Sequence, residues 1–157
     1  MKKWLFLVST LFLLASCGNE QSITTLVDPV PNQVIPSESE GISLKLLQHE
    51  FAEPPTHIET KVINANADAF EIGPFYHIEV LKDDLWYILT YSDAVFLRDP
   101  QFRDGGMVLE GHQEIQQTFS VEKLGISLPV GTYRLVKTVL QHDPYHEVTV
   151  AVPFTVQ

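Results

Sequence analysis

Cysteine is almost absent from this 157-residue chain, and the single one, Cys17, lies close to the amino terminus. A lone thiol has no partner within the chain, so no intramolecular disulfide can staple the fold. The folded part of the chain must therefore hold together by packing alone.

Positive charge is also scarce, with 10 lysine and arginine residues against 20 acidic ones and a formal net charge of −10. Two of the cations, Lys2 and Lys3, belong to the first residues, and without them the formal charge falls to −12. Phosphate backbones and anionic lipid leaflets attract positive charge and repel such a chain. The composition therefore argues against nucleic acid as a partner and against electrostatic binding to a membrane.

Long hydrophobic runs are missing apart from one, the 11 residues Trp4–Leu14 behind the cationic start. That run is too short to span a bilayer as a helix, which takes about 20 residues. Small residues follow it, and the three parts together are typical of a secretory signal. The sequence therefore predicts a signal peptide over residues 1–16 and an extracytoplasmic mature protein.

The residues at the predicted cleavage site, Leu14-Ala15-Ser16-Cys17, form a lipobox. We expect Cys17 to become the first residue of the mature chain and to carry a diacylglycerol on its sulfur. Two acyl chains hold a protein stably at a membrane, whereas one chain does so only marginally. The alternative is an ordinary cleaved signal followed by a spare cysteine. The lipobox favours attachment to the membrane through the lipid on Cys17.

Apolar residues are sparse from Gly18 to Glu40, where polar residues and prolines dominate. Such a composition buries too little apolar surface to offset the entropy of ordering the chain. Residues 17–40 are therefore predicted to be a lipidated amino terminus and a flexible tether, with a span of roughly 25–30 Å. Local docking of Leu26–Val34 on the domain is the alternative.

A helical period is missing from residues 41–157, which have the size of a single domain. Apolar and polar residues alternate there instead, as in strands with one buried face. Lys82-Asp83-Asp84 predicts the turn of a hairpin. The pattern predicts an all-β fold, an antiparallel β-sandwich of about seven strands. The predicted strands are 42–46, 58–63, 76–81, 85–89, 114–121, 132–140 and 147–156, with 94–97 as a further short one.

Some side chains within these strands carry specific expectations. Pro153 cannot donate to a ladder, so its strand is expected at a sheet edge or at a bulge. Trp86 is expected in the core or half-buried, since large aromatic residues on strands are usually structural. Arg134 and Lys137 are expected on the solvated outer face.

The run Leu128-Pro-Val-Gly-Thr-Tyr-Arg-Leu-Val-Lys resembles the penultimate strand of immunoglobulin-like domains. The resemblance implies that Tyr133 occupies a tyrosine corner and that Leu135 stands where an antibody domain has its second cysteine. More closely, residues 58–156 resemble the bacterial immunoglobulin-like domain of membrane lipoproteins. The matching segments, in order, are Ile72-Gly-Pro-Phe, Ile78-Glu-Val-Leu-Lys-Asp-Asp-Leu-Trp-Tyr, Gly131-Thr-Tyr-Arg-Leu-Val-Lys and Val152-Pro-Phe-Thr-Val. The resemblance implies an immunoglobulin-like sandwich at a membrane and no shared catalytic site.

Motifs of catalysis are missing from the sequence. It has no Gly-x-Ser-x-Gly and no His-Glu-x-x-His, and its Gly105-Gly106 pair lacks the lysine and the helix of a phosphate cradle. The one thiol is expected to be acylated, and no serine has a distinctive activating neighbour. The sequence therefore predicts a protein that is not an enzyme and that takes no cofactor.

His142 and His146 are the best candidates for metal chemistry, but their spacing is unfavourable. Pro144 between them disfavours a helix, and in an extended strand they would lie about 13 Å apart. A credible zinc site needs three or four ligands, so no metal site is predicted. A solvated turn is the preferred interpretation of this segment.

Polar and acidic side chains gather in three predicted loops, 65–74, 91–112 and 141–146. In an immunoglobulin-like sandwich these connections lie at one end, where antibodies bind antigen. This end is the predicted place for a ligand, whether a calcium ion, a basic partner or none, and the long middle loop is the favoured functional element. The candidate ligand residues are Asn66, Asp68, Asp99, Asp104, His142, Asp143 and His146, with Asn64 beside them.

Together these observations predict a membrane-anchored extracytoplasmic lipoprotein whose domain is a non-catalytic immunoglobulin-like binding or structural module. The anchor is expected at the outer face of the plasma membrane, or in the periplasm or outer membrane of an organism that has one. An envelope protein or polymer is the expected partner. The alternative is a small cation-responsive sensor or regulator of a neighbouring envelope protein.

Overall fold

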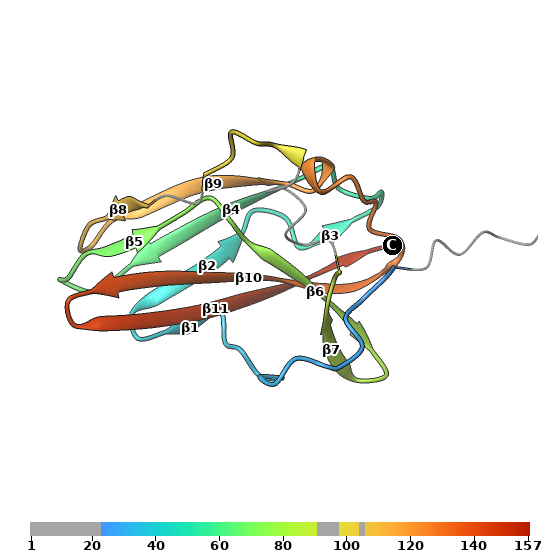
Figure 1. Cartoon of the computed structure of the whole chain (residues 1–157), viewed down its shortest axis with the longest axis horizontal. Helices are drawn as coiled ribbons and strands as arrows, with labels where there is room; N and C mark the ends of the chain where they lie inside the picture. Colours follow the sequence, from blue (N-terminus) through green and yellow to red (C-terminus); the bar gives the residue numbers. More distant parts are fainter. Residues whose placement is uncertain (1–22, 91–97, 104–105) are drawn as a thin grey trace, which may run out of the picture.

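The computed structural model describes residues 23–90, 98–103 and 106–157, which fold into two β-sheets packed face to face (Figure 1). The first sheet has four strands in the order β1-β2-β4-β9, all antiparallel to their neighbours. Its strands are β1 Glu38–Ser39, β2 Ile42–Leu46, β4 His57–Asn64 and β9 Glu114–Ser120.

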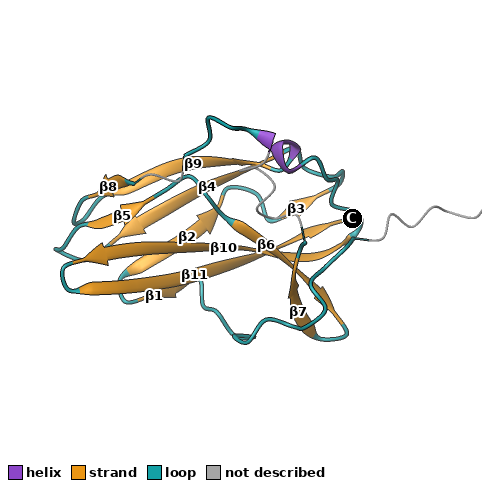
Figure 2. Ribbon diagram, in the orientation of Figure 1, coloured by secondary structure: helices purple, strands orange, loops and turns teal. Residues whose placement is uncertain are grey.

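The second sheet is built around the long hairpin of β10 and β11 (Figure 2). Strands β5 and β6 both pair with β10, at different points along it, and β8 and β7 extend the sheet beyond them. Strand β3 pairs with β11 in parallel. The strands are β3 Glu50–Phe51, β5 Phe70–Ile72, β6 His77–Lys82, β7 Leu85–Ile88, β8 Met107–Leu109, β10 Gly131–His142 and β11 Tyr145–Val156, and the short 3-10 helix η1 Glu122–Leu124 follows β9.

The predicted all-β sandwich is confirmed, and the long alternating runs form its long strands. Four short strands, β1, β3, β5 and β8, were not predicted, and β5 and β8 lie inside segments expected to be loops. The predicted strand 94–97 lies outside the described residues. Within the described part of the chain, no helix has the length and the apolar character needed to cross a bilayer.

The core between the sheets follows the alternation of the sequence. In β4, for example, Ile58 and Val62 are fully buried while Glu59 between them is exposed. Tyr133 is also fully buried, and its hydroxyl donates a hydrogen bond of 2.7 Å to the carbonyl of Pro129. This is the tyrosine corner that the resemblance implied. Leu135, at the position of the missing cysteine, is fully buried in the core.

Lys137 was expected on a solvated face because it is charged. That expectation was wrong, since Lys137 is buried on the core side of β10. It lies where the chain between β5 and β6 breaks away from regular pairing. Its ammonium group donates to the carbonyls of Gly73 and Phe75 and lies 4.3 Å from the centre of the Tyr76 ring. Carbonyls at the break are satisfied in this way, because a buried carbonyl without a donor is costly.

Residues 24–36, which we call the strap, cross the outer face of the second sheet beside β7 (Figure 1, blue). This differs from the flexible tether predicted for residues 17–40, and it agrees with the alternative of local docking. The strap supplies the missing neighbour of the β7 edge, so backbone pairing orders a segment that has little apolar surface to bury. The strap pairs with β7 and the two residues that follow it through Thr90 N to Thr24 O at 3.0 Å, Leu26 N to Ile88 O at 3.0 Å, Val30 N to Trp86 O at 2.9 Å and a bridge between Thr25 and Leu89.

Arg134 points outward as expected, but the strap covers it, and only 3% of it is exposed. Its guanidinium pairs with the buried carboxylate of Glu79 at 2.5 Å and donates to the carbonyls of Asn32 and Gln33 at 2.9 and 3.0 Å. It also lies 4.7 Å from the centre of the Trp86 ring, which is half-buried. The expectation of a solvated Arg134 was therefore wrong, because a distant part of the chain closes over it.

Three apolar side chains outside the main core are buried as well. Val30 of the strap is buried, and so are Val136 and Ala151 on the outer face of β10 and β11. The backbone amide of Ala151 donates to the carbonyl of Pro36 at 2.9 Å, which fixes the end of the strap against β11. These residues take no part in the main core cluster.

Pro153 was expected at a sheet edge or at a bulge, but its strand β11 lies between β3 and β10, and β3 pairs only with the last residues of β11. The amides of its neighbours on the same side of β11, Ala151 and Thr155, bond outside the hairpin, to the carbonyls of Pro36 and His49. Pro153 is exposed between them, and its nitrogen faces away from β10. Its missing N–H therefore removes no hydrogen bond from the β10–β11 ladder.

Candidate functional site

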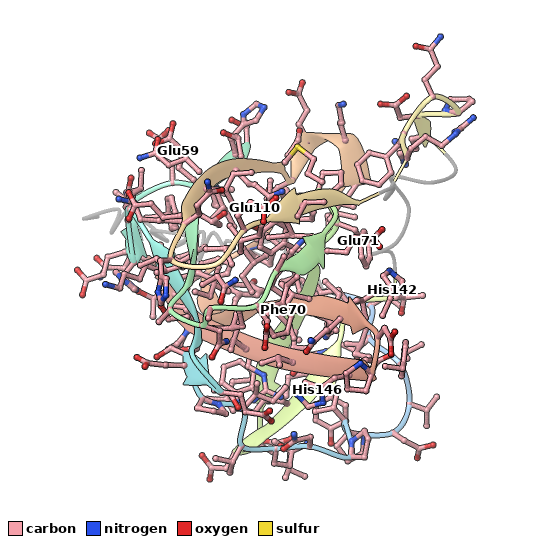
Figure 3. All side chains as sticks on the ribbon, turned by 90° about the vertical axis from the view of Figure 1, so that its left-hand side faces the viewer. Glu59, Phe70, Glu71, Glu110, His142 and His146 are labelled. Atoms are coloured by element: carbon pink, nitrogen blue, oxygen red, sulfur yellow. The ribbon has the colours of Figure 1, made fainter. Side chains whose placement is uncertain are left out.

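One end of the sandwich gathers the turns in which most of the candidate residues lie. We call it the loop end, and it consists of the β1–β2 turn, residues 65–69 between β4 and β5, residues 110–113 between β8 and β9, and the tip of the β10–β11 hairpin. Figure 3 faces this end. The carboxyl terminus and the start of the strap lie at the opposite end of the molecule (Figure 1).

Asn64, the last residue of β4, holds two of these segments together. Its side chain is fully buried, and its amide nitrogen donates to the carbonyls of Asp68, Leu109 and Glu110 at 2.8 to 3.2 Å. Its amide oxygen accepts the backbone N–H of Asn66 at 2.9 Å. Asn64 therefore positions the β4–β5 connection against the end of β8, and it does so without facing solvent.

His142 and Glu71 form a side-chain pair on the outer face of the second sheet. Glu71 lies opposite Leu140 in the ladder between β5 and β10, so His142 is its diagonal neighbour two residues further along the same face. Figure 3 shows the two side chains close together on one flank of the loop end. Glu71 was not among the sequence candidates, because its three-residue strand is too short to show alternation.

His146 points to the opposite face of the hairpin and reaches the other sheet. Its Nε2 lies 2.6 Å from a carboxylate oxygen of Glu40, in the tight β1–β2 turn where Glu40 and Gly41 both have positive φ. The side-chain amide of Asn66 donates to the carbonyl of Glu40 at 2.8 Å. His146 therefore helps to close the sandwich, and it does not converge with His142. Within the described residues no three histidine, cysteine or acidic side chains gather as metal ligands would.

The remaining candidates do not form one cluster. Asp143 lies in the two-residue turn of the β10–β11 hairpin, at the loop end. Asp99 lies at the other end of the first sheet, where its carboxylate accepts a hydrogen bond of 3.1 Å from Lys123 of η1. That bond lowers the pKa of Asp99. Asp104 lies outside the described residues. Asp99 therefore does not join the other candidate residues at the loop end. It is bonded to η1, which follows β9 at the opposite end of the sandwich.

An open groove of about 320 Å³ lies between β8, β5 and the end of β10. It is lined by Ala69, Phe70, Glu71, Gly106, Val108, Leu140, Gln141 and His142. Apolar side chains form much of this lining, and the His142–Glu71 pair supplies its charge. The groove therefore combines a short apolar floor with a single carboxylate–histidine pair.

Exposed apolar side chains flank this groove. Met107 and Val108 of β8 are 47% and 62% exposed, and Tyr145 at the hairpin tip is 66% exposed. Val108 lies opposite Glu71 in its ladder, and Tyr145 lies opposite His142, so these side chains share the outer face. The Tyr145 hydroxyl donates to the carboxylate of Glu147, and this hydrogen bond raises the pKa of Tyr145. The whole surface, from β8 to the hairpin tip, is thus both apolar and acidic.

Two packed antiparallel sheets with a tyrosine corner define the class of immunoglobulin-like β-sandwiches. The chain belongs to the bacterial Ig-like domain family, whose model matches residues 38–155. No curated protein and no solved structure matches it. Membership in this family indicates a structural or binding module, since Ig-like domains are generally not enzymes. The match begins at β1, so the strap precedes the part that the family shares.

Proposed function

We propose that this protein is a lipid-anchored, extracytoplasmic lipoprotein that uses its Ig-like domain to bind an envelope protein or polymer without catalysing a reaction. The lipobox Leu14-Ala15-Ser16-Cys17 is the observation that carries the membrane anchor. Family membership supports the binding or structural role of the domain.

The position of the strap implies that the proposed anchor lies close to the domain. Seven residue steps separate Cys17 from Thr24, the first of the described residues with a backbone–backbone hydrogen bond to the rest of the fold. A fully extended chain covers at most about 3.6 Å per residue, so this connection reaches about 25 Å. A lipid on Cys17 would hold the start of the strap within that distance of the bilayer, and the loop end would face away from it.

Replacement of the lipidated cysteine tests the anchor directly. We expect the Cys17→Ser variant to incorporate no labelled palmitate and to lose membrane retention after fractionation. Ser22→Ala is the matched control, since it lies just beyond the lipobox and leaves the modified sulfur in place. Acylation of the Cys17→Ser chain, or its unchanged retention by the membrane, would show that the anchor is assigned wrongly.

The binding role is tested by crosslinking in intact cells followed by affinity capture of the full chain. A binding module should yield the same envelope partner in repeated experiments. Reproducible absence of any partner at expression levels that saturate the membrane would leave a structural role in its place.

The alternative of a cation-responsive sensor has no supporting observation among the described residues. Its candidate ligands are divided between the two ends of the domain, and both hairpin histidines are already paired with carboxylates on different faces. We therefore do not propose it as a second function.

A further inference from the structure

We infer that the groove at the loop end, together with the edge of β8, binds an extended peptide segment that carries lysine or arginine. The inference deepens the proposed binding role by naming the surface and the chemistry of the partner. It does not depend on the lipid anchor, so the two can fail separately.

Strand β8 offers an edge to which another strand can be added. It is the last strand in its sheet, and among the described residues it pairs with β5 alone. Exposed edges with apolar side chains are sites of strand addition, in which backbone bonds give affinity and alternate side chains give selectivity. Met107 and Val108 supply the apolar side chains of this edge. A short extended segment therefore fits it better than a folded surface does.

The negative charge of the loop end favours a positively charged segment. The three stretches that build this surface, 64–72, 106–112 and 138–149, contain no lysine and no arginine. They contain five acidic residues, which are Asp68, Glu71, Glu110, Asp143 and Glu147. Complementary charge favours a cationic partner and penalises an acidic one. We therefore expect selectivity for basic peptides rather than for extended peptides in general.

Glu71 connects the acidic groove with the edge of β8. It lines the groove on the outer face, directly opposite the exposed Val108 of the edge strand. It is already paired with His142, whose side chain is largely exposed and can be displaced into solvent. A lysine or arginine of the bound segment can thus reach the Glu71 carboxylate while its apolar neighbours contact β8.

The surface is less suited to an envelope polysaccharide. Sugar rings stack on exposed aromatic faces, and among the described residues of this surface only Tyr145 offers an exposed ring, with its hydroxyl bonded to Glu147. The apolar edge of β8, which pairs with β5 alone in the part of the chain that the structure describes, matches a peptide instead. Binding of a polysaccharide at this surface is therefore an outcome that would count against the inference.

The test uses two synthetic octapeptides, one alternating valine and lysine and the other alternating valine and glutamate. The full chain in detergent micelles is titrated with each at low ionic strength, and binding is followed by calorimetry and by amide NMR shifts. We expect the basic peptide to bind, to move the amides of β8 and the groove, and to weaken as salt is added. Equal binding of the two peptides, or no binding of the basic one, would overturn the inference.

Variants then locate the binding. Val108→Lys places a like charge on the edge at an exposed position where strands tolerate lysine, and it should weaken the basic peptide about tenfold or more. Glu71→Gln should also weaken it, and it should do so less at high salt than at low salt. Val34→Lys is the matched control, because Val34 is 84% exposed on the strap, and it should leave affinity unchanged.

Equal effects of Val108→Lys and Val34→Lys would refute the assigned surface. Capture of an envelope partner whose binding is insensitive to Val108→Lys would also refute it, while the proposed binding role would stand. Loss of acylation in Cys17→Ser has no bearing on peptide affinity in micelles, so the anchor and the groove are judged by separate results.

Discussion

The buried pair of Arg134 and Glu79 should behave very differently from the exposed ion pairs of this domain. Arg134 is 3% exposed and Glu79 is 2% exposed, and the nearer carboxylate oxygen lies 2.5 Å from the guanidinium. The other carboxylate oxygen lies 3.0 Å from His77 Nε2. Removal of either partner therefore leaves a charge that water cannot reach.

The expected cost follows from that burial. Breaking a buried pair by removing one partner typically costs about 3–5 kcal/mol of unfolding free energy. The double variant Glu79→Leu/Arg134→Met removes both charges, and such replacements are often nearly neutral. It also loses the two bonds from Arg134 to the strap carbonyls, at roughly 1 kcal/mol each. We therefore expect the double variant to be more stable than either single variant.

Urea unfolding measures these differences in stability, and the fluorescence of Trp86 can follow it. Trp86 lies under the Arg134 guanidinium, and Trp4 is the only other tryptophan, so fluorescence in a Trp4→Phe background reports on Trp86. With a slope of roughly 1–3 kcal/mol per M, each single variant should lower the urea midpoint by about 2 M. The exposed pair Lys61–Glu114 serves as the control, since Lys61→Met should cost less than about 1 kcal/mol.

Additive effects would refute this reasoning. If the double variant loses the sum of the two single losses, to within about 0.5 kcal/mol, the pair has no coupling energy. The strap would then admit water to Arg134 and Glu79, and the burial described for them would not hold in solution.

Two further predictions concern the tyrosine corner and the loop end. Burial raises the pKa of Tyr133 to about 12 and also raises that of Tyr76, so the folded state keeps protons that the unfolded state releases near pH 10. The stability that these two tyrosines contribute should therefore be complete below about pH 10 and fall as the pH rises toward 12. The Tyr133→Phe variant should lose about 1 kcal/mol of unfolding free energy at pH 7, because it lacks the hydroxyl. Its urea midpoint should then fall less steeply than that of the unchanged protein between about pH 10 and 12. Asn64→Ala should cost roughly 2–4 kcal/mol, because it removes the donor of one buried and two partly buried hydrogen bonds, to the carbonyls of Leu109, Asp68 and Glu110. Hydrogen exchange should then accelerate at residues 65–69 and 110–112 more than in the centre of β4, and a uniform acceleration would contradict the positioning role of Asn64.

Alternation in the sequence was enough to predict the long strands, because their side chains divide cleanly between core and solvent. Strand β4 is of this kind, whereas part of the β10–β11 hairpin is buried on both faces. The two aspartates of the β6–β7 turn, Asp83 and Asp84, both have positive φ, as a two-residue hairpin turn requires. Short strands such as β5 and β8 were missed, since three residues are too few for a period to appear.

The two buried cations were missed for different reasons. Lys137 alternates with Tyr133 and Leu135 and so belongs to the core face, and that signal was present in the sequence. Its charge argued against burial. The carbonyls that accept its hydrogen bonds belong to the irregular segment between β5 and β6, which no sequence pattern predicts. Arg134 was placed on the correct face, but its cover comes from residues about a hundred positions earlier in the chain.

The candidate site was predicted in part. The connections near β4, β8 and the β10–β11 hairpin do meet at one end, as the resemblance to immunoglobulin-like domains implied. Asp99 does not join them, and the pairing of His142 with Glu71 and of His146 with Glu40 could not be read from spacing alone. Pairing across sheets depends on register, which the sequence of one strand does not reveal.

The strap changes where the folded unit of this protein begins. The region shared with the family starts at residue 38, yet Ala151 and Arg134 both bond to residues before it. A fragment cut at the family boundary would present apolar side chains and a desolvated ion pair to water, and it would leave the β7 edge open to self-association. The folded unit of this chain therefore includes the strap, and an expression fragment of the domain should begin before residue 23.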